Sequence, residues 1–149
     1  MARRRRAERR RPKLDPTYGS EELGRFINKV MVGGKQTTAQ RIVYRALDQV
    51  EAEAHRPGLE IFRQAVKNAT PMLEVRSRRV GGATYQVPRE VRAVRQLSLA
   101  MRWLVAGARA RSGRPMAERL AQELLEASRG QGSAIRKKED QHRMAEANR

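Results

Sequence analysis

The residues of this chain best suited to chemistry are its arginines, and the chemistry that they suit is phosphate binding. Of 149 residues, 33 are Lys or Arg against 16 Asp or Glu, so the net charge is +17, and 27 of the basic residues are Arg. A guanidinium can grip a phosphate through two parallel hydrogen bonds. A chain this basic repels itself without an anionic partner. The sequence therefore predicts binding to nucleic acid, with an anionic membrane surface as a weaker alternative.

The arginines are clustered along the chain. Arg76 and Arg78 are two apart on a predicted strand and share one of its faces, whereas Arg79 lies on the other. Arg92 and Arg95 fall at a predicted helix start, where positive charge opposes the helix dipole and indicates a bound anion. For each side chain alone, a solvated surface charge remains the alternative. The residues that we predict to bind RNA are Arg3, Arg4, Arg5, Arg6, Arg9, Arg10, Arg11, Lys35, Arg41, Arg76, Arg78, Arg79, Arg92, Arg95, Arg109, Arg111, Arg114 and Lys137.

Residues that could support catalysis or hold a metal are scarce. There is no cysteine, which excludes disulfides, cysteine-ligated metals and thiol nucleophiles. The Gly34-Lys35 pair resembles the end of a phosphate loop, but Gln36 stands where that loop needs Ser or Thr. Glu139 and His142 are three apart on a polar segment, and we expect a surface ion pair there rather than a metal or catalytic site. We predict no enzyme activity, catalytic residue, metal, cofactor or small-molecule substrate.

The basic residues at the start of the chain form a separate region. Residues 1–13 contain eight basic residues and one acidic residue, with no apolar periodicity. Like charges at this density cannot pack, so we expect an extended arm that is disordered when free. Because the arm has no apolar stretch, we expect neither a secretory signal nor a membrane partner. We expect residues 14–149 to form a single helical RNA-binding domain.

Apolar residues recur at helical spacing in six segments of this domain. The predicted helices cover approximately residues 20–33, 37–57, 59–70, 91–109, 116–125 and 133–147. Ser20, Thr37 and Ser133 are the expected N-caps, and Thr37 and Gln40 have capping-box spacing. The last helix projects, because its apolar face is thin.

A change of period interrupts the helices between the third and the fourth. Two alternating runs flank Gly81-Gly82 and predict a β-hairpin at about residues 72–88. A lone hairpin is marginal in water, so it must lean on the helices or on a partner. On the fourth helix, Val94 belongs to the main apolar stripe, whereas Leu99 and Trp103 lie off it, so two faces should be covered. The fold class is therefore mainly α: a bundle of about six helices with one protruding β-hairpin and a basic, extended N-terminal arm.

Two other kinds of function remain open on these residues. Residues 21–54 form a predicted helix–turn–helix, and this allows a DNA-binding regulator, although the start of the second helix is weakly basic. A general architectural nucleic-acid-binding protein would also suit the charge. An RNA-modifying enzyme has no nucleophile or cofactor loop in its favour.

Five stretches of the sequence resemble the bacterial small-ribosomal-subunit protein seven family, and the resemblance spans nearly the whole chain. They are SEELGRFINKVMVGGK (20–35), RIVYRA (41–46), EVRSRRVGGATYQVP (74–88), SLAMRWL (98–104) and KKEDQHRMAEANR (137–149). The hairpin stretch is the most specific of them. The family's fold, six helices with a hairpin arm, agrees with the elements predicted above.

The resemblance implies a structural protein of the cytoplasmic ribosome. Such a protein binds the 3′ major domain of small-subunit ribosomal RNA, helps to nucleate assembly of the subunit head and contacts neighbouring small-subunit proteins. It also implies that the hairpin and the C-terminal region lie near the exit-site transfer RNA and the messenger RNA. Carried over by position, the residues near these two RNAs are Arg78, Arg79, Gly81, Gly82, Tyr85 and Arg143. Gln36 departs from the family's usual Lys or Arg, so no phosphate contact is carried over there.

Overall fold

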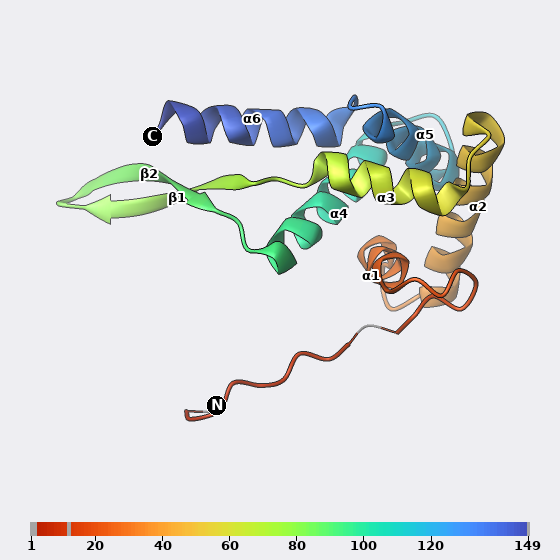
Figure 1. Cartoon of the computed structure of the whole chain (residues 1–149), viewed down its shortest axis with the longest axis horizontal. Helices are drawn as coiled ribbons and strands as arrows, with labels where there is room; N and C mark the ends of the chain where they lie inside the picture. Colours follow the sequence, from red (N-terminus) through yellow and green to blue (C-terminus); the bar gives the residue numbers. More distant parts are fainter. Residues whose placement is uncertain (1–2, 12, 149) are drawn as a thin grey trace.

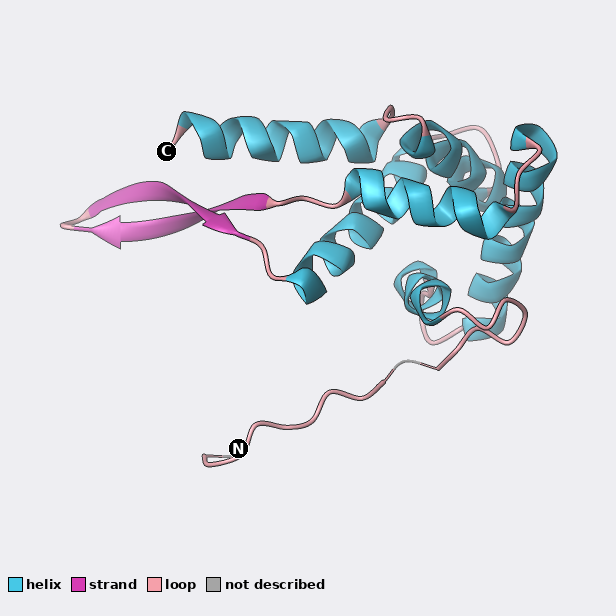
Figure 2. Cartoon of the chain, in the orientation of Figure 1, coloured by secondary structure: helices cyan, strands magenta, loops and turns pink. Residues whose placement is uncertain are grey.

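The computed structural model describes residues 3–11 and 13–148. The predicted arm also includes residues 1, 2 and 12, and the RNA-proximal C-terminal stretch includes residue 149; these four lie outside the described residues. In order, the elements are α1 (Glu21–Val30), α2 (Gln36–Ala54), α3 (Gly58–Ala69), β1 (Leu73–Val80), β2 (Ala83–Glu90), α4 (Ala93–Ala110), α5 (Met116–Ser128) and α6 (Ser133–Ala147). Figures 1 and 2 show the mainly helical bundle with one hairpin between α3 and α4, which confirms the predicted fold class.

The bundle core is built mostly from aliphatic side chains of α1 to α5, and Ala134 and Ile135 of α6 complete it. The helix α5 packs against α2, α3 and α4, so it is the element that joins the others. The rings of Phe26 and Phe62 meet edge to face at 5.0 Å, and both are fully buried. Leu99 and Trp103 are only 6% and 8% exposed, which confirms that α4 is covered on two faces.

The hairpin follows from its Gly-Gly turn. Both Gly81 and Gly82 have positive φ, 58° and 84°, which is the backbone of a tight two-residue turn and strains any other residue. The strands pair antiparallel from Val80 opposite Ala83 down to Leu73 opposite Glu90. The hairpin therefore ends two residues later than predicted. Its tip projects away from the bundle, and α6 runs alongside it and contacts both strands (Figure 1).

The docking of α6 explains how a helix with a thin apolar face is held. Ala134, Ile135 and Ala145 are its buried residues. Lys138 Nζ donates to the Asn68 carbonyl at 2.9 Å. His142 Nε2 accepts the Met72 backbone N–H at 2.9 Å. The predicted ion pair between Glu139 and His142 is therefore wrong: the imidazole binds the connection between α3 and the hairpin instead.

Two predicted helix caps are also wrong. The structure confirms Ser20, whose Oγ accepts the Leu23 N–H at 3.2 Å. The helix α2, however, begins at Gln36 with Lys35 as N-cap, because the glycine turn brings the Gln36 N–H onto the Gly34 carbonyl and leaves Thr37 inside the first turn. No side chain caps this helix.

At α6 the N-cap is Gly132, which has a φ of 95°, and not Ser133. The Ala134 N–H donates to Glu123 of α5 at 3.1 Å, so a residue from another helix supplies the cap.

Val94 of α4 is 53% exposed, although it lies on the predicted apolar stripe. The reason is that the first turn of α4 lies beyond the edge of the bundle, beside the base of the hairpin.

The carboxylate of Glu123 joins three helices. Its side chain is fully buried in α5, and its Oε2 accepts hydrogen bonds from Arg111 Nε and Nη2, at 3.2 and 3.0 Å, just after α4. Its Oε1 accepts the Ala134 N–H of α6. The same Arg111 also pairs with Glu126. Burial alone would raise the pKa of Glu126, but the hydrogen bonds from Arg111 and Gln122 outweigh it and hold that pKa below its usual value. A buried carboxylate with these partners fixes where α4 ends and where α6 begins.

Gly107 of α4 makes room for this carboxylate, and this gives a stability prediction. A Cβ at position 107 would lie 2.7 Å from Glu123 Oε1 and 2.8 Å from its Cδ. In an exposed helix, Gly→Ala adds about 1 kcal/mol of stability. We expect Gly107→Ala to lower the free energy of unfolding instead, by about 1–3 kcal/mol, because the displaced carboxylate is pinned by Arg111 and the Ala134 N–H. Urea denaturation measures this change.

The matched control is Ala106→Gly, at the exposed neighbouring position of α4. It should cost about 0.5–1 kcal/mol through helix propensity alone. A Gly107→Ala variant more stable than the parent chain would contradict the role assigned to Glu123.

Candidate nucleic-acid interface

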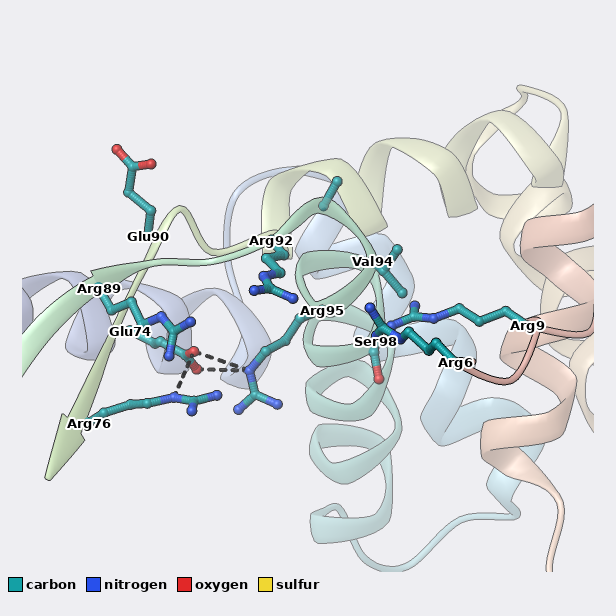
Figure 3. Close-up of a pocket in the computed structure, with 11 residues that line it drawn as sticks. Arg6, Arg9, Glu74, Arg76, Arg89, Glu90, Arg92, Val94, Arg95 and Ser98 are labelled. Atoms are coloured by element: carbon teal, nitrogen blue, oxygen red, sulfur yellow. Dashed lines mark hydrogen bonds and ion pairs between the residues drawn. The ribbon is translucent and has the colours of Figure 1, made fainter. Parts of the chain in front are cut away.

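Basic side chains from three segments line one groove. The N-terminal arm, the base of the hairpin and the start of α4 enclose an open cavity of about 720 Å³. Figure 3 shows the side chains that line it. Its charged residues are Arg6, Arg9, Glu74, Arg76, Arg89, Glu90, Arg92 and Arg95. Six arginines and two glutamates line the groove, so it carries a positive charge that suits phosphate.

The start of α4 adds to this positive potential. Arg92 is the N-cap, its side chain makes no capping hydrogen bond, and the first turn of the helix has no acidic residue. The backbone N–H groups at a helix start point outward and carry a partial positive charge. The helix α1, by contrast, begins with the Ser20 cap and two glutamates. The sequence predicts a bound anion near Arg92 and Arg95. The structure places both residues at a helix start whose first turn has no acidic side chain to balance their charge.

The structure separates the predicted hairpin cluster into two parts. Arg76 lies at the base of the hairpin, in the groove, where its Nε is 3.4 Å from Glu74. Arg78 lies nearer the tip and pairs across the strands with Tyr85, which is 57% exposed. Opposite residues of an antiparallel pair point to the same face, so a cation and an aromatic ring lie together on the exposed tip. Arg79 points to the other face, as predicted.

Two predicted RNA-binding residues make contacts inside the protein. Arg109 Nη2 donates to the Val30 carbonyl at the end of α1, at 3.3 Å. Arg111 donates to Glu123 and Glu126. Burial alone would lower the pKa of Arg111, but these two carboxylates raise it above its ordinary value. Both guanidiniums thus hold elements of the bundle together.

The remaining predicted residues lie on exposed parts of the chain, away from the groove. Lys35 and Arg41 are at the start of α2, Arg114 is in the connection before α5, and Lys137 is on α6. Arg143, also on α6, makes an exposed ion pair with Asp140 at 3.3 Å. Exposed ion pairs are weak, so this pair leaves the guanidinium accessible. On the arm, the predicted residues outside the groove are Arg3, Arg4, Arg5, Arg10 and Arg11, all exposed.

Sequence reasoning missed the residues that anchor the arm. Asp15 is only 2% exposed; its Oδ2 accepts the N–H groups of Thr17 and Tyr18, and its Oδ1 accepts the Tyr44 hydroxyl of α2. Burial raises the pKa of Tyr44, and the hydrogen bond to Asp15 raises it further. The Asp-Pro-Thr sequence at 15–17 is typical of a turn in which the Asp side chain accepts a backbone N–H two residues on. This pattern could have predicted the turn at Asp15.

The groove glutamates were missed as well. Glu74 is a buried acidic residue in an otherwise basic strand, and its pairing depends on α4, which follows it by some twenty residues of sequence. No local pattern marks such a residue.

These features define a class of protein: a basic, mainly helical, nucleic-acid-binding protein whose cations gather on an arm, a hairpin and helix starts. No helix in the described part of the chain is long and apolar enough to cross a membrane.

Comparison with known proteins agrees with this class. The model of the ribosomal protein S7p/S5e family matches residues 2–149. The small ribosomal subunit protein uS7 of Thermotoga petrophila is 60% identical over 147 residues, which are 99% of this chain and 95% of the relative. The uS7 protein of Sulfurimonas denitrificans is 56% identical over 99% of this chain and 95% of the relative. That of Methylococcus capsulatus is 54% identical over 100% of this chain and 96% of the relative.

The chain therefore belongs to the ribosomal protein S7p/S5e family. This makes it a structural, RNA-binding protein of the small subunit of the cytoplasmic ribosome, and not an enzyme. Such a protein contacts ribosomal RNA and neighbouring ribosomal proteins. The resemblance found in the sequence is confirmed.

The contact between His142 and Met72 generates a prediction about pH. Burial lowers the pKa of His142, and the nearby Lys138 lowers it further, against a smaller opposite effect of Glu146. A histidine with a lowered folded pKa contributes stability above its unfolded pKa of about 6.5, and loses it as pH falls through the folded value. Protonated Nε2 can no longer accept the Met72 N–H. We therefore expect the free energy of unfolding to fall between pH 7.5 and pH 5.5, as measured by urea denaturation.

His142→Gln should weaken this pH dependence. The control is His55→Asn, because His55 lies at φ 56° after α2, where Asn is tolerated. An equal loss of pH dependence in both variants would show that the docking of α6 is not the cause.

Proposed function

We propose that this chain binds the 3′ major domain of small-subunit ribosomal RNA and helps to nucleate assembly of the subunit head. The observation that carries the proposal is the groove, in which the N-terminal arm meets the base of the hairpin and the start of α4, so that six arginines come together. A site built from an arm, a hairpin and a helix suits RNA helices that must be gathered from several directions. The family resemblance of the sequence supplies the identity of the RNA domain.

The proposed mechanism is architectural, with no bond made or broken. The arginines of the arm and the groove neutralise phosphates and release the counterions condensed on the RNA. Affinity then falls with salt, with a log–log slope of roughly −0.7 to −0.9 per phosphate contacted. Specificity comes from RNA shape and unpaired bases, because the major groove of an A-form helix is too narrow to read. The proposed single domain, residues 14–149, is the platform that sets the spacing of the contacts.

We further propose that the hairpin tip and α6 lie near the exit-site transfer RNA and the messenger RNA. Both elements project from the bundle side by side (Figure 1), and both carry exposed cations, Arg78 and Arg79 on the hairpin and Arg143 on the helix. Tyr85 offers a ring on which an unpaired base can stack. Gly81 and Gly82, without side chains, let an RNA backbone approach the turn closely.

The DNA-binding alternative gains no support from α2. This helix packs against α1, α3 and α5, and its exposed first turn holds Gln36, Thr37 and Thr38 in place of basic residues. A recognition helix is held in the major groove by phosphate contacts as well as by base contacts, and this first turn carries no cation for them. We therefore prefer structured RNA as the ligand.

Binding titrations test the proposed RNA. The ligands are the 3′ major domain of small-subunit ribosomal RNA, an unrelated structured RNA of equal length and duplex DNA, at fixed salt and magnesium. We expect the ribosomal fragment to be bound at least about tenfold more tightly than the others, since specific nucleic-acid complexes exceed non-specific ones by far larger factors. Deleting residues 2–11 should lower the affinity for all three ligands alike, because the arm supplies charge. Equal binding of all three by the full chain would refute the proposal.

A second experiment tests the hairpin in assembled subunits. We expect Arg78→Ala together with Arg79→Ala to reduce cross-linking of the chain to exit-site transfer RNA, because two cations leave the tip. The matched control removes the same charge from the bundle surface through Arg63→Ala and Arg102→Ala, both at exposed helical positions. The same reduction in both double variants would mean that net charge, not the hairpin, governs the contact.

A further inference from the structure

A buried carboxylate lies in the middle of the arginine groove. The side chain of Glu74 is 6% exposed, although most of β1 faces solvent. Arg95 Nε donates to both of its oxygens, at 3.2 and 3.0 Å, and Arg76 Nε lies 3.4 Å from Oε1 (Figure 3). A carboxylate this buried needs such partners, because it has lost its water. Glu74 is therefore an integral part of the groove.

The two arginines that hold Glu74 keep other donors for a ligand. The side chains of Arg76 and Arg95 are 53% and 44% exposed, and each meets the carboxylate through Nε. In Figure 3 the terminal amino groups of Arg95 point away from Glu74. A guanidinium has five N–H donors, so Nε can bind a carboxylate while the terminal amino groups bind a phosphate.

We propose that Glu74 is a positioning residue for RNA phosphate. It holds Arg76 and Arg95 side by side, with their free donors directed at a single phosphate group. Without a carboxylate between them, the two guanidiniums would repel each other and sample many rotamers. The inference rests on the proposed function and adds to it the residue that organises the site.

An account based on charge alone gives the opposite expectation. Glu74 is an anion in a groove for anions, so its removal should strengthen RNA binding if only net charge matters. In Glu74→Gln the amide NH₂ would replace one of the two oxygens that accept from Arg95 Nε, donor against donor, and the negative charge between the two guanidiniums would be lost. Positioning therefore predicts weaker binding although the net charge rises by one.

Glu90 provides a matched control. It lines the same groove and carries the same charge, but it is exposed, at the end of β2. Removing its charge leaves the pair of Arg76 and Arg95 intact. Glu90→Gln should bind RNA at least as tightly as the parent chain.

The experiment is a titration of full-length Glu74→Gln and Glu90→Gln with the 3′ major domain fragment and with the unrelated RNA, over a series of salt concentrations. We expect Glu74→Gln to bind the fragment on the order of tenfold more weakly, the size of one lost charge-assisted hydrogen bond. Its salt dependence should also become shallower, because fewer phosphates are contacted. Binding by Glu74→Gln as tight as that of Glu90→Gln would overturn the proposal.

If circular dichroism shows that Glu74→Gln does not fold, Arg95→Lys takes its place in the titration. Arg95 is about half exposed, so the substitution should be tolerated. It retains the charge but removes the Nε donor that binds both oxygens of Glu74, so we expect a similar loss of affinity. Unchanged binding would count against positioning. The proposed function has its own test: it is wrong if the parent chain does not prefer the ribosomal fragment. In that case, weaker binding of both RNAs by Glu74→Gln would still support the role of Glu74.

Discussion

Repulsion among 33 basic residues is the constraint on which the rest of this structure depends. A net charge of +17 on a bundle this small opposes compaction. Many of the cations lie far from one another, on the arm, the hairpin and the exposed starts of α2, α4 and α6. Two buried carboxylates balance part of the remaining charge: Glu74 pairs with Arg76 and Arg95 at the groove, and Glu123 pairs with Arg111 inside the bundle. The distribution of cations that suits RNA is thus also the one that lets the free chain fold.

The two buried carboxylates have different consequences, although their chemistry is the same. Glu123 is fully buried and satisfied by Arg111 and a backbone N–H, so it joins α4, α5 and α6 and leaves nothing for a ligand. Glu74 is almost as buried, at 6% exposed, but its arginine partners remain about half exposed. The exposure of the arginine therefore decides whether an arginine–carboxylate pair only stabilises the fold or also offers donors to a ligand.

The elements could be predicted from the sequence because each depends on local periodicity. The six helices and the hairpin follow from apolar spacing and from Gly81-Gly82, and Ser20 caps α1 as its type and place suggest. The predicted N-caps of α2 and α6 were wrong because these helix starts are set by a glycine turn and by Glu123 of another helix. The predicted ion pair of His142 was wrong because its actual partner, Met72, lies 70 residues away in the sequence. Contacts made across the fold leave no mark in the local pattern.

The candidate site shows the limit of counting charges. Arg109, Arg111 and Arg119 fall in one basic stretch, yet all three hold the bundle together: Arg119 Nη1 donates to the carbonyls of Arg109 and Arg111 at the end of α4. Arg109 and Arg111 stand at the carboxyl end of α4, where a cation complements the dipole, and Arg119, from the start of α5, reaches across to the carbonyls of the same end. Arg92 and Arg95 stand at a helix amino end, where stability disfavours them. Position relative to the helix dipole, more than the number of arginines, therefore distinguishes the arginines whose placement the fold explains from those whose placement it does not.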